Sequence, residues 1–472
     1  MYQGWIDQVE EYMNGHRQEL VDCVCRLVNI PSVKGESLPD APYGIGPKKA
    51  LMEGLRICQE NGLVPYNHEN RCGSGIYQVN GAEKEIGFVA HLDVVPAGEG
   101  WTSDPFQGIE RNGFIVGRGA RDNKAGFAAA LLAINCVRDL NVPLSSNIRL
   151  VMGCDEESGM SDMEYYAENC PLPDFSIVTD CYFPVAHGEK GIFHGDVVMP
   201  VENPILTLQA GTATNIIPGV ATAQLDTDKA DIHRLQEMSK DESHISITTT
   251  DNRIVISAEG ISAHASEPEM ARNAIYLLVD FLLRANVVTG TEEHALNFIR
   301  DALNFNYGEF FGIEYEDDIS GKTTCIGGIL SSSKNEIRLN LNIRYSVTDH
   351  HDRFYPFLQQ CCEEKGYTFV LHEASAPHYI PGDRPEVVNL TNIYQRVSGD
   401  DRPAYVVAGG TYARKLPNSI AFGPGSKDEI FPYPPGYGDA HQPDESQSID
   451  YLLMAAKIYA LAIIELDEII NR

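Results

Sequence analysis

Imidazole and acidic side chains stand at the ends of short apolar runs in this sequence. His91 closes the run 86–90, and Asp180 follows the run 175–179. Runs of this length and composition are typical of buried parallel strands. Parallel strands bring their carboxyl ends to one edge of a sheet, which is where open α/β sheets bind their ligands. We therefore expect His91 and Asp180 to lie near one another.

A third apolar run, 148–152, is followed by the acidic stretch Asp155, Glu156 and Glu157. Adjacent carboxylates repel one another unless a positive charge lies between them or one of them holds a proton. A metal ion would supply that charge, with one carboxylate on the metal and its neighbour over the bound water. The alternative interpretation is a solvated acidic turn.

Two further acids have both a chemical and a purely structural interpretation. Asp93 lies two residues after His91, where it could accept a hydrogen bond from the second imidazole nitrogen, as in many metal sites, or form an ordinary polar contact. Asp122 ends the glycine-rich loop 117–121 and precedes an alanine-rich segment. It could bridge two metal ions, or it could cap a helix together with Asn123.

His441 lies in a late polar loop, residues 438–445. Together with the acids at the strand ends it gives a mixed set of His, Asp and Glu ligands without cysteine. This set favours zinc, or cobalt or manganese in its place. Two ions that share one carboxylate stabilise both a nucleophilic hydroxide and a tetrahedral oxyanion, which is the chemistry of amide hydrolysis.

The pattern of apolar residues predicts how these side chains are positioned. A helix is expected over 127–140, between the first two strands, and a strand, helix, strand order is typical of an α/β domain. After Gly191 the pattern changes to alternating strands, such as 221–226 and 337–345, with a helix near 272–284. Helical periodicity returns from about residue 385.

We therefore predict an α/β fold with a mixed, mainly parallel sheet flanked by helices, interrupted by an inserted α+β domain. The expected boundaries are 1–191 and 386–472 for the α/β domain and 192–385 for the inserted domain, which the family resemblance described below makes the catalytic domain and its lid. The length of 472 residues supports more than one core.

Composition excludes several classes of partner. The formal net charge of −31 disfavours nucleic acid and anionic membrane surfaces. The first residues have no basic segment followed by an apolar core, and the apolar stretch 452–466 contains Lys457 and is too short to span a bilayer. The eleven cysteines show no zinc-knuckle spacing and fit reduced thiols. A cytoplasmic protein is expected.

Together these motifs resemble the co-catalytic zinc amidohydrolases, which include aminoacylase, carnosinase and the bacterial PepV-type dipeptidases. The resemblance covers nearly the whole chain and is strongest for the PepV-type subgroup. It is carried by residues 91–98, 101–106, 117–122 and 155–159.

The resemblance implies a particular set of roles at the metal site. It implies two zinc ions, with manganese or cobalt as substitutes, one held by His91 and Asp180, the other by Glu157 and His441, and both by Asp122. Glu156 would be the general base that deprotonates a water bridging the two ions, and Asp93 would be a further catalytic residue.

It also implies residues that recognise the substrate. His264, in the motif 262–266, resembles the lid histidine of the family, Asn215 resembles a substrate-contacting asparagine, and Arg344 resembles the arginine that binds the C-terminal carboxylate. Gly410 and Thr411 are expected to contact substrate as well. Without the resemblance, His264 could be an ordinary polar histidine and Arg344 a surface charge on a strand.

The expected function is therefore zinc-dependent hydrolysis of dipeptides by a monomer or weak homo-oligomer whose partners are small peptides. An N-acyl-amino-acid deacylase or a carboxypeptidase on the same fold is the alternative among enzymes. A catalytically silent metal-binding protein is the alternative from another class. Glu156 argues against the silent protein, because metal binding alone requires no general base.

Overall fold

The structure is a computed structural model, and it describes residues 2–250 and 252–472. The chain forms two compact units. The first contains Met1–Gly188, Tyr379–Tyr405 and Gly410–Arg472, and the second contains Glu189–His378 and Val406–Gly409. The second unit is thus inserted into the sequence of the first.

The first unit is built on a nine-stranded sheet. Its strand order is β1 (Val64–His68), β2 (Cys72–Tyr77), β6 (Ser146–Gly153), β3 (Lys84–His91), β7 (Phe175–Val178), β24 (Ser419–Phe422), β9 (Val185–Glu189) and β22 (His378–Tyr379), with β23 (Tyr405–Val407) paired to β9. The central pairs β6–β3, β3–β7 and β7–β24 are parallel, whereas β1–β2, β2–β6 and β24–β9 are antiparallel.

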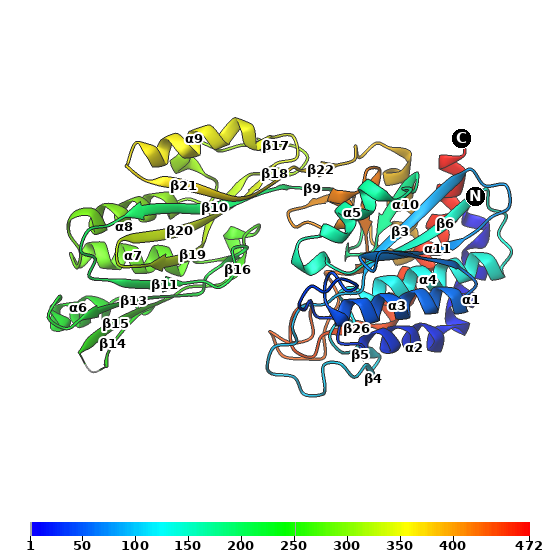
Figure 1. The fold of residues 1–472 in the computed structure, drawn as a ribbon, viewed down its shortest axis with the longest axis horizontal. Coiled ribbons are helices and arrows are strands. Elements are labelled where there is room, and N and C mark those ends of the chain that lie inside the picture. Colours follow the sequence, from blue (N-terminus) through cyan, green and yellow to red (C-terminus); the bar gives the residue numbers. More distant parts are fainter. Residues whose placement is uncertain (1, 251) are drawn as a thin grey trace. The chain divides into compact units, whose positions relative to one another are not determined.

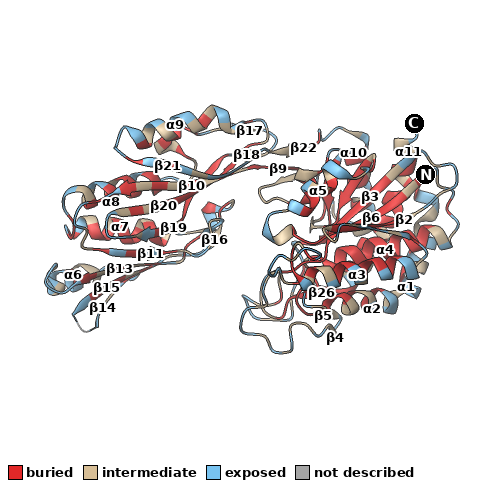
Figure 2. Ribbon diagram, in the orientation of Figure 1, coloured by how far each residue is buried: buried red, intermediate tan, exposed pale blue. Residues whose placement is uncertain are grey.

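Helices cover this sheet (Figure 1). They are α1 (Ile6–Gly15), α2 (Arg17–Val28), α3 (Ile45–Glu60), α4 (Lys124–Asp139), α5 (Ser161–Asn169), α10 (Pro385–Ser398) and α11 (Ile449–Ile470). Helix α4 packs on β3 and β6 and contacts α11, and α3 packs on β1, β2 and β6. In α4 every residue from Lys124 to Val137 is buried, as Figure 2 shows by colour. An alanine-rich helix can be covered on all sides in this way because its side chains are small.

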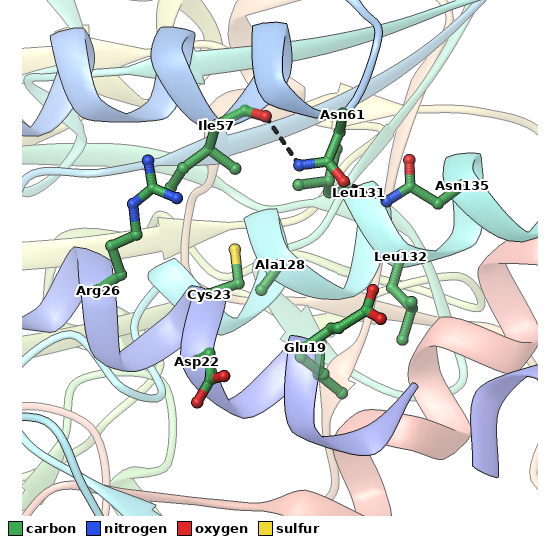
Figure 3. A pocket seen from close by; sticks show the side chains of 11 residues that line it. Glu19, Asp22, Cys23, Arg26, Ile57, Asn61, Ala128, Leu131, Leu132 and Asn135 are labelled. Carbon is green, nitrogen blue, oxygen red and sulfur yellow. Dashed lines mark hydrogen bonds between the residues drawn. The ribbon is translucent and has the colours of Figure 1, made fainter. Parts of the chain in front are cut away.

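A pocket of about 230 Å³ lies among α2, α3 and α4 of the first unit (Figure 3). Its walls include Cys23, Ile57 and Leu131. At one side the Asn135 amide donates to Asn61 Oδ1 at 2.7 Å, and the Asn61 amide donates to the Ile57 carbonyl at 2.8 Å. None of the side chains that line this pocket belongs to the predicted site.

Two small sheets connect loops of the first unit. One pairs β4 (Ile109–Arg111) with β5 (Phe114–Val116) and β5 with β26 (Ser446–Ser448). The other pairs β8 (Cys181–Tyr182) with β25 (Pro424–Gly425) in parallel. Within the residues that the structure describes, no helix is both long enough and apolar enough to cross a membrane.

The second unit contains an antiparallel sheet of eight strands. The order is β14 (Ile245–Thr250), β15 (Arg253–Glu259), β13 (Val220–Asp226), β11 (Thr207–Ala210), β19 (Thr324–Ser332), β20 (Glu336–Tyr345), β10 (Gly191–Pro200) and β21 (Thr368–Ser375). Two short pairs accompany it: β12 (Ile216–Ile217) with β16 (Ala263–His264), and β17 (Glu316–Asp317) with β18 (Gly321–Lys322).

Four helices accompany this sheet: α6 (Ile232–Ser239), α7 (Ala274–Arg284), α8 (Gly290–Leu303) and α9 (His351–Glu363). Helix α7 packs on β13 and β15, and α9 packs on β10 and β21. A separate apolar core, which includes Phe193, Leu278 and Leu341, holds the second unit together. The expected fold, a mainly parallel sheet flanked by helices with an inserted α+β module, is confirmed.

Candidate metal centre

His91 is the last residue of β3, and its side chain is buried. Its Nε2 atom lies 2.9 Å from Asp122 Oδ1 and 3.6 Å from Asp180 Oδ2. Asp180 follows β7, which pairs in parallel with β3, so both side chains reach the carboxyl edge of the sheet. The structure therefore brings together the two residues expected from the strand ends.

Asp93 joins His91 to the acidic turn. His91 Nδ1 lies 3.0 Å from the Asp93 carbonyl oxygen and 3.5 Å from its Oδ1. The Asp93 carboxylate accepts hydrogen bonds from the backbone N–H groups of Glu156 and Glu157, each at 3.2 Å. We expected the carboxylate to accept from the imidazole. Instead the backbone carbonyl is the nearer acceptor, and the carboxylate holds the turn that carries the two glutamates.

A second imidazole faces the other side of Asp122. His441 Nε2 lies 3.2 Å from Asp122 Oδ2 and 3.1 Å from Glu157 Oε1. The two carboxylate oxygens of Asp122 thus face different histidines. Half of the His441 side chain is exposed, at 51%, whereas the His91 side chain is 0% exposed.

The ligand atoms form two overlapping groups, in each of which all atoms lie within 4.8 Å of one another: His91, Asp122 and Glu157, and His91, Glu156 and Asp180. These atoms are imidazole nitrogens and carboxylate oxygens. This donor set fits zinc, and also manganese or cobalt. All six residues that the sequence placed at or near the metal, these five and His441, converge in the first unit.

The acids of the centre are crowded and buried, and their pKa values respond to this. Burial raises the pKa of Glu156 well above its ordinary value; His91 opposes the shift, and Asp180 and Glu157 add to it. Burial and the neighbouring charge of Asp122 raise the pKa of Asp180 to about 7. A divalent cation would relieve this repulsion, because it places positive charge among the carboxylates.

Asp122 shows the opposite shift. Burial acts to raise its pKa, but hydrogen bonds from His441 and His91 outweigh burial and hold the pKa well below the usual range. Hydrogen bonds to Asp122 and Glu157 in turn raise the pKa of His441 to about 11. The two histidines therefore favour the ionised form of Asp122.

The start of α4 lacks the side-chain cap that the sequence offered as one interpretation. Asn123 occupies the N-cap position, but its side chain makes no capping hydrogen bond. Its amide instead donates to the Thr179 carbonyl at 2.5 Å and to Asp180 Oδ1 at 2.7 Å. Asn123 therefore takes the N-cap position without capping the helix through its side chain, and Asp122 lies against His91.

Two supporting residues were not found from the sequence. Asp162 is buried, and its Oδ2 accepts hydrogen bonds from Asp155 N at 2.9 Å and from the Tyr412 hydroxyl at 2.5 Å. The Tyr412 ring stands edge-on to His91, with ring centroids 6.3 Å apart. Asp162 lies in the first turn of α5, where an acid is expected for helix stability alone, so local sequence carried no signal for this second role.

The second unit gathers three of the predicted substrate contacts. His264 in β16 pairs with Ile216 in β12, and Ala265 N donates to the Asn215 carbonyl at 2.8 Å. Burial and the nearby charge of Arg344 lower the pKa of His264. The expectation of a surface charge does not hold for Arg344, because the residue is only 5% exposed.

The Arg344 side chain lies within a local network of the second unit. Its Nε donates to Asn342 Oδ1 at 3.0 Å, and its Nη1 donates to the Ala408 carbonyl at 3.3 Å. Gly410 and Thr411 belong to the first unit, where the Thr411 hydroxyl caps the short helix η5 (Tyr412–Lys415). Their contact with substrate stays a prediction.

Comparison with known proteins identifies the family to which this cluster of candidate metal ligands belongs. The family model described as "Peptidase family M20/M25/M40" matches residues 87–465. "Putative dipeptidase YtjP" of Bacillus subtilis (strain 168) is 31% identical over 469 residues, covering 95% of this chain and 97% of the relative. A "Putative dipeptidase" of Staphylococcus epidermidis is 28% identical over 480 residues, covering 97% and 98%.

Solved structures with the same fold include human carnosine dipeptidase 1, with a TM-score of 0.58 and 14% identity over 98% of this chain and 99% of that one. The dipeptidase Dug1p of Saccharomyces cerevisiae gives a TM-score of 0.58 and 13% identity over 98% of each chain. These likenesses concern the fold, while the family match and the B. subtilis relative concern the sequence itself. The chain belongs to peptidase family M20/M25/M40.

Proposed function

We propose that this metallopeptidase is a dipeptidase that uses two divalent metal ions, preferably zinc. The observation that carries the proposal is the position of Asp122, whose two oxygens face His91 at 2.9 Å and His441 at 3.2 Å. A carboxylate between two imidazoles, with further acids on each side, supports the proposal because a shared carboxylate can hold a pair of metal ions. The names of the similar bacterial proteins support the choice of dipeptides.

The residues divide into two ligand sets that share one member. His91 and Asp180 would hold one ion, Glu157 and His441 would hold the other, and Asp122 would contact both. When bound, the two ions would polarise the scissile carbonyl and lower the pKa of a nearby water molecule. Asp93 would fix the turn that presents Glu156 and Glu157, because its carboxylate accepts both backbone N–H groups.

Glu156 is the proposed general base. It lies among the ligands, as part of the group with His91 and Asp180, yet the ligand division leaves it without an ion of its own. A carboxylate placed beside the ions, but not used as a ligand, can accept a proton and later return it. Glu156 would take a proton from the attacking water and pass it to the leaving amine.

Arg344 and His264 are the proposed recognition residues. A guanidinium can bind a terminal carboxylate through two parallel hydrogen bonds, which would favour peptides with a free C-terminus. A neutral imidazole can donate a hydrogen bond to the developing oxyanion, and the lowered pKa of His264 favours that neutral form. Asn215, Gly410 and Thr411 are proposed as further substrate contacts.

A substrate panel tests the proposal. Metal-stripped protein would be reloaded with zinc, manganese or cobalt and offered free dipeptides, their N-acetylated forms and longer peptides. We expect metal-dependent hydrolysis of free dipeptides above all. Faster hydrolysis of the N-acetylated forms would show that the protein is a deacylase. Efficient removal of single C-terminal residues from long peptides would show that it is a carboxypeptidase.

A further inference from the structure

His441 is held differently from the other proposed ligands. It lies between β25 and β26, in a segment outside any regular helix or strand, and 51% of its side chain is exposed. Its backbone has a φ of 65°, in the left-handed region that residues other than glycine rarely adopt. Such a conformation is unfavourable and persists only where surrounding contacts impose it. Contacts other than side-chain packing must therefore position this imidazole.

Glu445, four residues after His441, supplies the first of these contacts. Its side chain is 0% exposed. One oxygen, Oε1, accepts backbone N–H groups from three residues of the loop that ends in Asp122: Gly119 at 3.0 Å, Arg121 at 3.0 Å and Asp122 itself at 3.1 Å. The other oxygen pairs with the Arg118 guanidinium. The carboxylate thus fixes the loop of Asp122 to the segment of His441.

Arg118 extends the connection to His441 itself. Its side chain is 1% exposed, and its Nη2 donates to the His441 carbonyl at 3.2 Å and to the Ala97 carbonyl at 3.1 Å. The Trp101 ring covers the guanidinium, with 5.2 Å from Cζ to the ring centroid. One buried cation therefore contacts Glu445, the backbone of His441 and the segment that follows His91 and Asp93.

A second arginine of the same loop makes a parallel set of contacts. Arg121 Nη1 lies 2.5 Å from Glu429 Oε2, and its Nε lies 3.0 Å from Asp439 Oδ1. Glu429 Oε1 in turn accepts the backbone N–H of Ser448 in β26 at 2.9 Å. Burial acts to lower the pKa of Arg121, but the Glu429 carboxylate outweighs it, so the guanidinium stays charged.

The two loops also leave neighbouring strands. Ser446, at the start of β26, pairs with Val116, at the end of β5, and Gly117 N donates to the Glu445 carbonyl at 2.9 Å. The loop with Asp122 begins after Val116, and the segment with His441 ends before Ser446. Because both are anchored at the same place, the ion pairs between them control how far apart Asp122 and His441 lie.

We propose that Arg118, Arg121, Glu429 and Glu445 form an arginine–carboxylate latch that positions His441 against Asp122 and thereby sets the affinity of the metal position on the His441 side. The inference rests on the proposed two-metal function. The four are positioning residues, since they act on the metal only through His441 and Asp122. The position formed by His91 and Asp180 lies on strand ends and should be much less sensitive to the latch.

Replacing a residue of the latch should have a large effect on metal affinity for a physical reason. Removing one partner of a buried ion pair leaves an uncompensated charge, which is far more disruptive than the loss of a surface pair. Residues that orient metal ligands from behind typically change metal affinity by about tenfold to a hundredfold when they are replaced. His441 is half exposed and has a left-handed backbone, so apart from the contacts of its ring with Asp122 and Glu157 its position depends on how its own segment is held.

Glu445→Gln is the sharpest test, because glutamine keeps an oxygen for the three backbone N–H groups and loses both the charge and the acceptor opposite Arg118. We expect the variant to bind one ion as tightly as the parent does and the second ion about tenfold to a hundredfold more weakly, so that dialysis leaves one ion per chain. Metal analysis after dialysis and competition with a chelator measure both affinities. The visible spectrum of the cobalt-loaded protein should lose the bands of one site.

A matched control is the ion pair Arg149–Glu85 of the same unit, whose Nε to Oε1 distance is 2.6 Å and whose side chains are 8% and 15% exposed. Arg149→Met should lower stability and retain both ions. If it lost the second ion to the same extent, general destabilisation would explain the effect, and the latch would be overturned.

The remaining outcomes separate the latch from the function on which it rests. A parent that binds two ions and a Glu445→Gln variant that binds both with unchanged affinity overturn the latch alone. A parent that binds a single ion overturns the two-metal proposal, and the latch with it. Should Glu445→Gln not fold, Arg121→Lys replaces it, since lysine keeps the charge and loses the fork that contacts both Glu429 and Asp439; unchanged affinity for both ions would again overturn the latch.

Discussion

The two units of this chain contribute different kinds of side chain to the proposed function. The first collects four carboxylates, one of them Asp122, and two imidazoles. The second collects the guanidinium of Arg344 and the imidazole of His264 with Asn215. The acidic set suits cations and proton transfer, and the Arg344 guanidinium suits recognition of a substrate carboxylate.

The difference follows from the two sheets. Parallel strands such as β3 and β7 end at one edge, so their following residues meet without further design. Antiparallel strands alternate in direction, and the second unit therefore presents Arg344 from within β20 and His264 from the short pair β12–β16. Catalysis and recognition can be altered separately if this division is correct. The following experiments are arranged from the largest expected effect to the smallest.

Glu156→Gln should separate chemistry from metal binding in the first unit. We expect turnover to fall about a thousandfold or more, because the variant can neither accept the proton of the water nor return it to the amine. Metal content should stay at the parent level, because the ligands remain in place. Steady-state kinetics and metal analysis of the same preparation measure the two. Near-normal turnover would rule out Glu156 as the base.

Arg344→Ala should impair recognition and spare the metal centre. Loss of a charge-assisted pair should raise the KM for free dipeptides about tenfold to a hundredfold. A dipeptide with an amidated C-terminus should be hydrolysed poorly by the parent and lose little further in the variant, because it has no carboxylate to bind.

His264→Ala serves as the contrast for Arg344 within the second unit. It should lower kcat more than it raises KM, since a donor to the oxyanion acts chiefly on the transition state. If Arg344→Ala raised the KM of the free dipeptide and of the amidated dipeptide equally, Arg344 would not bind the substrate carboxylate. Loss of metal in either variant would contradict the division of labour between the units.

Asp122→Ala and Asp180→Ala compare a shared ligand with an unshared one. Asp122 faces both imidazoles, whereas Asp180 approaches only His91. The first substitution should therefore weaken both ions and the second mainly one, with a difference in retained metal of about one ion per chain under identical dialysis. A greater loss in Asp180→Ala would argue against the bridging role of Asp122.

Titration of Asp162 should have a smaller, pH-dependent effect on the stability of the folded protein. Burial raises its pKa to about 7, with the charge of Asp93 adding to the shift. An aspartate in an unfolded chain titrates near pH 3.9. Between about pH 4 and pH 7 the folded protein therefore keeps a proton that the unfolded chain has lost. The stability contributed by this group declines as pH rises, by up to about 1.4 kcal/mol per pH unit.

The comparison of parent and Asp162→Asn isolates this contribution. Urea unfolding of both metal-free proteins would be measured between about pH 5 and about pH 8. The unfolding free energy of the variant relative to the parent should rise with pH up to about pH 7 and stay constant above it. A difference that does not vary with pH would mean that Asp162 is already ionised in the folded protein at the low end of the range.

The amino-acid sequence alone predicted the α/β class, the buried strands that end at His91 and before Asp180, and the convergence of the acidic residues. These predictions rest on local patterns: apolar runs of strand length fix the strands, and parallel pairing fixes where they end. The inserted module was visible as a change of periodicity after Gly191. Roles for Glu156, Arg344 and His264 came from the family resemblance and not from the pattern.

The tertiary structure alone determined how the ligands are supported. Arg118 and Glu445 are 327 residues apart in the chain, and no local pattern pairs a glycine-rich loop with a distant glutamate. Asp93, Asn123 and Asp162 each had an ordinary local explanation that the structure replaced with a contact to another segment. Elements follow from short-range propensity and periodicity, whereas the partners of a buried polar side chain depend on which distant segments the fold brings together.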